Sequence, residues 1–119
     1  MGDLTENFSK REFACRCGCG FDTPSLKLVQ LLQRIRNHIG QPITVVSGCR
    51  CPKHNSAVGG ARNSQHLLGK AADIKVPGLY PEKLGEYLEE HFGARIGGMG
   101  IYATFVHIDV REYRVRWRG

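Results

Sequence analysis

The stretch from Ser47 to Lys70 constrains the fold of this chain more than any other segment does. Glycine, proline and asparagine recur in it at short intervals, and these residues favour turns and interrupt helices and strands. It lies between two short segments, Ile43–Val46 and Ala71–Val76, which we predict to be buried strands. A loop of this length in a small domain is usually functional or disordered. We therefore expect the fold to be built around this loop.

Two segments with helical features flank the two predicted strands and the loop between them. The first should begin near Pro24, because Thr23 can cap a helix and proline suits the first helical position, and it should end at Gly40. The second covers Pro81–His91 and is followed by Gly93. Apolar residues of the first segment recur at helical spacing and form one face, at Leu28, Leu31, Leu32, Ile35 and Ile39.

The C-terminal part of the chain predicts a hairpin, with strands at Arg95–Tyr102 and Thr104–Val110. The resulting order is helix, strand, long loop, strand, helix and hairpin. It predicts an α+β domain with a small, largely antiparallel sheet and helices packed on one side. The 119 residues fit one domain over 1–119, with a cysteine-rich N-terminal segment at about 1–21.

Composition argues against several classes of protein. Apolar residues make up 41% of the chain and charged residues 24%, which is typical of globular proteins and not of disordered ones. There is no long uncharged apolar run, so we predict no membrane span. The first residues lack a basic start followed by an apolar stretch, so we expect no secretory signal. We expect synthesis in the cytoplasm, with action there or release by another route such as lysis.

The formal net charge is +6, and much of it lies near the end, at Arg111, Arg114, Arg116 and Arg118. A basic protein attracts polyanions, which include nucleic acid, anionic membranes and anionic cell-wall polymers. Charge alone does not choose among these partners. The arginine cluster has two interpretations, a solvated strand edge or a surface that holds a polyanion.

The five cysteines have an uncommon spacing. Cys15, Cys17 and Cys19 form C-x-C-x-C, and Cys49 and Cys51 form C-x-C, so an odd number is present and full pairing within one chain is excluded. They could form a second, structural zinc site, form disulfides between the two clusters, or stay reduced. The spacing differs from the usual C-x-x-C of zinc sites, and without a signal peptide disulfides are less expected. We expect the two clusters to lie close together and leave the bond open.

Three residues have side chains that suit zinc, namely His66, Asp73 and His107. His66 and Asp73 are seven residues apart, which would separate them by roughly 23 Å on a straight strand and by about 10.5 Å along a helix axis. Neither arrangement allows shared ligation, whereas a chain reversal does, and Gly69 can take the backbone angles that a reversal requires. We therefore predict a turn with His66 before it and Asp73 on the strand that follows.

The segment around His107 has the alternation of a strand with two different faces. Val106 and Ile108 lie on one face, which should point to the core, whereas His107 and Asp109 share the other. His107 and Asp109 should therefore point together into a polar groove. A catalytic zinc site has three protein ligands and one open position, and two histidines with one carboxylate meet this count.

These residues carry a family resemblance. The pattern Ser-x-His-x-x-Gly-x-Ala-x-Asp at 64–73, followed by Val-His-x-Asp at 106–109, resembles the zinc D-Ala-D-Ala carboxypeptidase and endolysin peptidase family. That family includes VanX- and VanY-like enzymes and shares its fold with the hedgehog signalling domain. Residues 47–55 and 58–60, and Glu-Phe-x-Cys-x-Cys-Gly-Cys-Gly at 12–20, resemble its small single-domain members. The likeness covers nearly the whole chain.

The resemblance also implies roles for single residues. Many relatives place a carboxylate three residues before the last histidine ligand, but here that position is Thr104, which cannot act as a base near neutral pH. We therefore predict Asp109, on the strand face of His107, as general base; the alternative is a partner that orients the ligand. Arg50 is predicted to bind substrate or stabilise developing negative charge; the alternative is an ion pair that only braces the loop. Ser64 is predicted to contact substrate; the alternative is that it only caps its turn.

The resemblance implies a zinc metallopeptidase that hydrolyses peptide bonds of peptidoglycan stems or cross-links, as a D-Ala-D-Ala carboxypeptidase or an endolysin-type endopeptidase. One catalytic Zn²⁺ would polarise the scissile carbonyl and activate a water. We expect a monomer that acts on the cell wall, with phage-type release as one route to it, and that binds peptidoglycan peptide and no nucleic acid.

Two other functions compete with this prediction. One is a hedgehog-like module that keeps zinc and binds cell walls without catalysis, and the missing carboxylate at Thr104 is its best support. The other is a basic, cysteine-rich zinc module for nucleic acid. It explains the charge and the thiols, but it leaves His66, Asp73 and His107 unexplained and lacks interleaved aromatic residues or a clear recognition helix.

Overall fold

A five-stranded sheet forms the centre of the structure, with strand order β1-β2-β4-β3-β5. The computed structural model describes residues 2–119, so Met1, the first residue of the expected cysteine-rich segment, lies outside the described residues. All neighbouring strands are antiparallel except β3 and β5, which are parallel. This confirms the predicted α+β class with a largely antiparallel sheet. The strands are β1 (Thr44–Ser47), β2 (Ala71–Lys75), β3 (Gly98–Ile101), β4 (Val106–Asp109) and β5 (Val115–Arg118).

The two long helices are α2 (Leu26–Ile39) and α4 (Pro81–Phe92), and both agree with the predicted segments. Helix α2 begins at Leu26 instead of Pro24, because the backbone of Ser25 is not helical and its N–H donates to the carbonyl of Gly69 at 2.8 Å. Gly40 ends α2 in the left-handed conformation at φ 70°, as predicted. No helix within residues 2–119 is long and apolar enough to cross a membrane. The short helices are α1 (Lys10–Phe13), α3 (Pro52–Ala57), η1 (Gln65–Leu68) and η2 (Gly93–Arg95).

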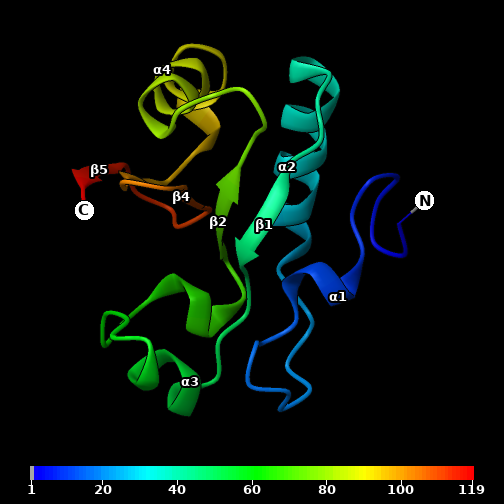
Figure 1. Cartoon of the computed structure of the whole chain (residues 1–119), viewed down its shortest axis with the longest axis vertical. Coiled ribbons are helices and arrows are strands. Elements are labelled where there is room, and N and C mark those ends of the chain that lie inside the picture. Colours follow the sequence, from blue (N-terminus) through cyan, green and yellow to red (C-terminus); the bar gives the residue numbers. More distant parts are fainter. Residues whose placement is uncertain (1) are drawn as a thin grey trace.

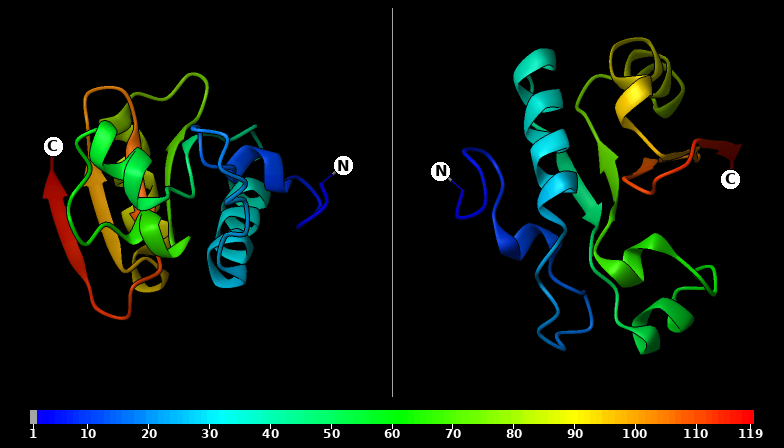
Figure 2. Two further views of the ribbon diagram at one scale, coloured as in Figure 1. Left: turned by 90° about the horizontal axis from the view of Figure 1, so that it is seen from below. Right: turned by 180° about the vertical axis from the view of Figure 1, so that it is seen from behind.

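Helices α2 and α4 contribute to one hydrophobic core with one face of the sheet. Ala72 and Ile74 of β2 are fully buried there, as are Val106 and Ile108 of β4. Because side chains alternate along a strand, the residues between these core positions direct their side chains to the opposite face of β2 and β4. Helix α3 and the turn η1 lie at the other end of the molecule from α4, as Figure 1 and the right view of Figure 2 show. The core side chains of the two long helices are Leu28, Val29, Leu31, Leu32, Ile35, Leu84, Leu88 and Phe92.

Three parts of the fold differ from the sequence predictions. The 47–70 segment is not a continuous loop but contains α3 and η1. The first strand of the predicted hairpin is shorter than Arg95–Tyr102, because η2 continues helix α4 through Arg95 and the strand begins only at Gly98. Strand β5 was not predicted, because its alternating arginines hide the apolar pattern of a strand and its pairing with β3 is set by tertiary contacts.

The C-terminal arginines pair with carboxylates of α4. Arg114 and Arg116 both donate to Glu89, at 2.8 Å and 2.6 Å, and Arg118 donates to Glu82 at 2.6 Å. These bonds connect the edge strand β5 to α4 and neutralise part of the basic stripe. The cluster therefore agrees better with a structured strand edge than with a free surface for a polyanion.

The Glu89 contacts predict a pH-dependent contribution to stability. Hydrogen bonds from Arg116 and Arg114 lower the pKa of Glu89 from 4.5 to about 2, against the small opposing effect of its burial. A carboxyl group whose pKa is lowered by folding stabilises the protein above its unfolded pKa, and this stabilisation is lost as pH falls through its folded pKa. The Glu89→Gln variant should lose about 1 kcal/mol of unfolding free energy at pH 7, a value discounted for solvent screening of a partly exposed group.

This difference should shrink as pH is lowered from about 4.5 toward 2, measured by denaturant unfolding of both proteins under the same metal conditions. Glu90→Gln is the matched control, since Glu90 lies next to Glu89, is 76% exposed and has only a distant contact with His91. An equal loss in both variants, or a loss at Glu89 that does not depend on pH, would contradict this account.

Candidate metal centre

His66, Asp73 and His107 come together from three separate elements. Asp73 on β2 and His107 on β4 are directly opposite each other in the antiparallel pair. His66 lies in η1, and Gly69 ends that turn in the left-handed conformation at φ 68°. The predicted chain reversal between His66 and Asp73 is therefore a short 3₁₀ turn that leads into β2.

The distances within this group suit a metal ion. Oδ1 of Asp73 lies 3.2 Å from Nε2 of His66 and 3.0 Å from Nδ1 of His107. Tetrahedral zinc, with nitrogen and oxygen ligands at about 2.0–2.1 Å, places neighbouring ligand atoms about 3.3 Å apart. One ligand atom from each residue lies within 4.8 Å of the others, and all three residues are buried. The group could therefore hold a metal ion.

The other ring nitrogens fix the tautomers of both histidines. Nδ1 of His66 lies 2.6 Å from the carbonyl oxygen of Gly48, and Nε2 of His107 lies 2.8 Å from Oδ2 of Asp109. A carbonyl and an ionised carboxylate only accept hydrogen bonds, so these nitrogens carry the hydrogens. In the neutral rings, the lone pairs of the remaining nitrogens then point at the oxygen of Asp73. The two nitrogen lone pairs and the carboxylate oxygen repel one another unless a cation or extra protons lie between them. A metal site has this arrangement of atoms, with the cation in the middle.

The charges agree with this arrangement. Burial would raise the pKa of Asp73, but hydrogen bonds from the His107 and His66 rings in their protonated forms outweigh it and lower this pKa to about 2. Burial would lower the pKa of His107, but hydrogen bonds with Asp109 and Asp73 outweigh it and raise this pKa. Asp73 is therefore ionised near neutral pH, and a positive charge is favoured beside it.

Asp109 lies behind His107 and is fully buried. Its Oδ1 accepts from the backbone N–H of Gly98 at 2.8 Å and from Nε of Arg111 at 2.9 Å, and its Oδ2 accepts from Nη2 of Arg111 at 2.7 Å. Only glycine fits at position 98, because a Cβ there would collide with Oδ2. Burial would raise the pKa of Asp109, but the bonds with His107 and Arg111 hold it well below the usual range. This environment favours a role in orienting His107 over a role in taking up a proton.

The guanidinium of Arg50 contacts the same group from the 47–70 segment. Its Nη2 donates to Oδ2 of Asp73 at 3.2 Å, its Nη1 to Oδ1 of Asn55 at 3.2 Å, and its Nε to Oγ of Ser47 at 3.1 Å. A Cβ at Gly60 would collide with the amide of Asn55, so this contact also requires a glycine. The predicted alternatives for Arg50 are thus not exclusive, since it braces the loop and faces the site.

The group opens into a cleft of about 560 Å³. Sequence reasoning missed two of its aromatic residues, Tyr102 and Trp117. Trp117 on β5 donates from Nε1 to the hydroxyl of Tyr102 at 2.9 Å, and its ring centre lies 5.1 Å from that of His107. A Cβ at Gly100 would collide with the indole, so this glycine makes room for it. The only signal in the sequence is that Trp117 is the single tryptophan of the chain.

Two other residues that the sequence singled out are placed differently. Ser64 lines the cleft, and its Oγ accepts from the N–H of His66 at 3.2 Å, so it also caps η1. Thr104 lines a separate hollow beside Leu84. Among the described residues that line the cleft, Asp73 is the only one with a carboxylate. The cleft therefore offers no second carboxylate as a proton acceptor.

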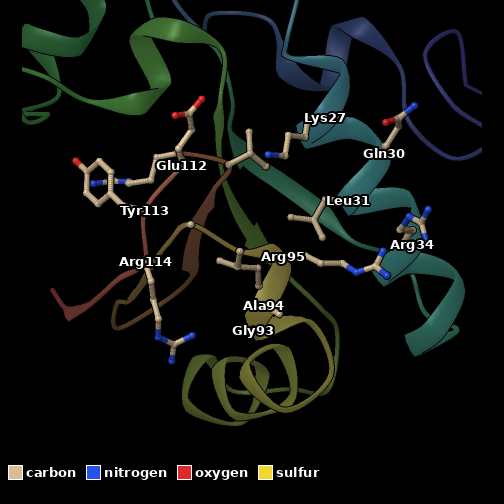
Figure 3. A pocket seen from close by; sticks show the side chains of 14 residues that line it. Lys27, Gln30, Leu31, Arg34, Gly93, Ala94, Arg95, Glu112, Tyr113 and Arg114 are labelled. Atoms are coloured by element: carbon tan, nitrogen blue, oxygen red, sulfur yellow. The ribbon is translucent and has the colours of Figure 1, made fainter.

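A second hollow, of about 520 Å³, lies between α2, η2 and the segment that follows β4 (Figure 3). Lys27 and Arg34 of α2 line one side of it, Arg95 of η2 extends toward Arg34, and Arg114 lies on the opposite side. Its described lining residues include no histidine or cysteine and only one carboxylate, that of Glu112. It is therefore a basic surface hollow and does not provide the ligands of a metal site.

Four of the five cysteines also form a group that could hold a metal ion, namely Cys15, Cys17, Cys19 and Cys51. The two cysteine clusters are close together, as predicted, and no disulfide joins any of the five cysteines in the structure, which describes all of them. The fifth, Cys49, is buried and lies outside this group.

Comparison with known proteins places these residues in a family. The chain is similar to the probable peptidoglycan L,D-endopeptidase MepK of Haemophilus influenzae, with 32% identity over 102 residues, which cover 77% of this chain and 53% of that protein. It is also similar to the zinc D-Ala-D-Ala carboxypeptidase of Streptomyces albus G, with 52% identity over 44 residues, which cover 36% of this chain and 17% of that protein. The chain thus spans about half the length of the first relative. The family model described as Peptidase M15 matches residues 6–109, which include His66, Asp73 and His107, and the chain belongs to this family.

Proposed function

We propose that this protein is a zinc metallopeptidase that hydrolyses peptide bonds of peptidoglycan stem peptides or cross-links. The observation that carries the proposal is the convergence of His66, Asp73 and His107, with fixed histidine tautomers, beside an open cleft. Membership of the Peptidase M15 family supports the reaction class. The names of the two relatives, an L,D-endopeptidase and a D-Ala-D-Ala carboxypeptidase, support peptidoglycan as the substrate class and the cell wall as the place of action.

Each side chain of the site has a separate task in this proposal. His66, Asp73 and His107 would hold Zn²⁺, which when bound polarises a peptide carbonyl and makes a water a better nucleophile. Gly48 and Asp109 fix the orientation of the two imidazoles through their second nitrogens. Because an oriented ligand does not have to be reorganised during the reaction, these contacts prepare the site before substrate binds.

The remaining polar groups of the cleft favour an acidic peptide as substrate. Arg50, Arg62 and Arg111 line the cleft, whereas Asp73 is the only described carboxylate in it and would be occupied by the metal. Peptidoglycan stem peptides carry free carboxylates, and a planar guanidinium binds a carboxylate with two hydrogen bonds. We propose that Arg50 binds such a carboxylate or the developing oxyanion, and that the hydroxyl of Tyr102 donates to the same substrate.

One observation favours a second candidate function, a zinc-containing module that binds cell walls without cleaving them. Asp109 accepts hydrogen bonds on both oxygens and has no exposed surface, and among the described residues that line the cleft Asp73 is the only carboxylate. A peptidase needs a group to move the proton of the attacking water. Release of wall fragments by the zinc-loaded protein separates the two functions, because the binding module would retain the wall and release nothing.

The ligand assignment predicts that His66→Ala and His107→Ala abolish hydrolysis. Each variant removes one of three metal ligands, so the zinc affinity of the His66–Asp73–His107 group and fragment release from purified peptidoglycan should fall by at least about 100-fold. Competition with a chelator and mass spectrometry of the released fragments measure the two effects. His54→Ala is the matched control, because His54 lies in the same 47–70 segment but outside the metal group. Full wall cleavage by either ligand variant would refute the proposal.

The position of Asp109 predicts a different effect for Asp109→Asn. If Asp109 orients His107, the variant should bind zinc about 10- to 100-fold more weakly, and saturating zinc should restore part of the activity. Competition with a chelator measures the affinity. Glu112→Gln, an exposed acid in the following loop, should change neither quantity. Unchanged zinc affinity with complete loss of activity at every pH would instead identify Asp109 as the general base.

Arg50→Lys tests the role of the guanidinium. Lysine keeps the positive charge but lacks the planar group that contacts Asp73, Asn55 and Ser47 together. We expect kcat/KM on a stem peptide to fall by about 10- to 100-fold with the zinc content unchanged. The same substitution at Arg62, a cleft residue with no described bond to the metal group, should have a smaller effect. Loss of zinc from Arg50→Lys would show that the residue mainly braces the site.

A further inference from the structure

The cysteine group lies apart from the histidine site and has no part in the proposed reaction. Sγ of Cys15 is 3.4 Å from Sγ of Cys17 and 3.8 Å from Sγ of Cys51, and the last two sulfurs are 3.5 Å apart. Cys19 completes the group, in which all four sulfurs lie within 4.8 Å of one another. The chain thus brings three cysteines that follow α1 to a fourth that precedes α3.

These distances fit a tetrahedral metal centre. Zinc binds thiolates at about 2.3 Å, so two sulfurs of a tetrahedral site lie about 3.8 Å apart. A disulfide would require about 2.05 Å and would join only two of the four sulfurs. Four sulfurs around one point leave no coordination position open, which is the property of a structural site and not of a catalytic one.

The backbone explains how an uncommon spacing gives this geometry. In an extended segment, alternate cysteines would share a face but stand about 6.6 Å apart. Here Gly18 and Gly20 take positive φ angles of 79° and 94°, and the N–H of Gly18 donates to the carbonyl of Cys15 at 3.1 Å. A Cβ at either glycine would meet nothing within 4 Å, so the left-handed backbone and not a lack of space requires glycine. Gly18 thus bends the chain within C-x-C-x-C, and Gly20 turns it directly after Cys19.

Backbone donors also point at two of the sulfurs. The N–H of Cys51 lies 3.4 Å from Sγ of Cys15, and the N–H of His54 lies 3.4 Å from Sγ of Cys51. Hydrogen bonds of this kind are stronger to a charged acceptor than to a neutral one, so they favour the thiolate that binds metal.

We propose that Cys15, Cys17, Cys19 and Cys51 bind a second, structural zinc ion. The ion would join the N-terminal segment to the 47–70 segment at the point where the latter meets the candidate metal centre. A hydrogen bond already links these two segments nearby, since the N–H of Cys49 donates to the carbonyl of Phe13 at 2.8 Å. The proposal concerns these four thiolates alone and does not depend on the proposed hydrolysis.

The structural zinc would stabilise the backbone that supports the histidine site. The carbonyl of Gly48 holds the ring of His66, and the N–H of Arg50 donates to the carbonyl of His66 at 3.1 Å. Cys51 follows directly in the sequence. The fourth cysteine ligand therefore fixes the end of the short segment that orients His66 and carries Arg50.

Zinc analysis of purified variants tests the proposal without reference to activity. The wild-type protein should contain about two zinc ions per chain, and both His66→Ala/His107→Ala and Cys17→Ser/Cys51→Ser should contain about one. Cys49→Ala, which removes the one cysteine outside the group, should retain about two. Cobalt substitution should give intense thiolate-to-metal absorption in the histidine variant and none in the double cysteine variant. About one zinc in wild type, lost on removal of the histidines, would overturn the proposal.

Alkylation of the wild-type protein is a second test that needs no variant. Cys17 and Cys19 are exposed, so as free thiols they should react with iodoacetamide at once. As zinc ligands they should react much more slowly until a chelator is added, and peptide mass mapping assigns each modified cysteine. Immediate alkylation of Cys17 and Cys19 before chelation, or a disulfide within the group in freshly purified protein, would contradict the zinc site.

Discussion

The pairing of β2 with β4 determines the geometry of the whole site. Their register places Asp73 directly opposite His107, and Ala72 opposite Ile108 on the core face. Because side chains alternate, a shift of one residue in either strand would move a buried charged group into the hydrophobic core and a core residue into the cleft. The packing of α2 and α4 against Ile74, Val106 and Ile108 therefore stabilises the same register that forms the metal group. The core side chains and the side chains of the metal group therefore lie on the two opposite faces of the same strand pair.

The segment that follows β1 supplies the rest of the site and connects it to the N-terminal part. Gly48, Arg50 and Cys51 contact, in turn, the ring of His66, the carboxylate of Asp73 and the sulfur of Cys15. The N-terminal segment approaches closely here, and this approach requires glycine at position 48, because a Cβ there would collide with Phe13. The cysteine-rich segment is thus part of the support of the site and not a separate appendage. This explains why the segment between β1 and β2 is long yet well packed.

The sequence predicted the parts of the site that depend on local chemistry. The reversal at Gly69 and the two faces of the strand around His107 follow from backbone conformation and alternation, and the structure has both. Trp117 could not be predicted, because its contacts with Tyr102 and His107 join separate elements. The contacts of Asn55 with Arg50 and of Arg111 with Asp109 are local, but they depend on side-chain orientations that sequence spacing does not give. Strand β5 shows the same limit, since its alternating arginines look solvated until the carboxylates of α4 are placed beside them. Spacing determines a turn or a strand face, but not which distant element packs on it.

In the proposed hydrolysis, the environment of Asp109 restricts how the proton of the attacking water can move. Thr104 lines a different hollow, and Asp109 is held by Gly98, Arg111 and His107 at the back of the site. To act as a base, Asp109 would have to break the hydrogen bond that orients a metal ligand and give up its ion pair, both of which favour its charged, unprotonated state. An orienting carboxylate has the opposite requirement, because it must stay ionised while His107 donates to it. The contacts of Asp109 satisfy the second requirement, so the catalytic proton would have to be taken up by water or by the substrate in the cleft.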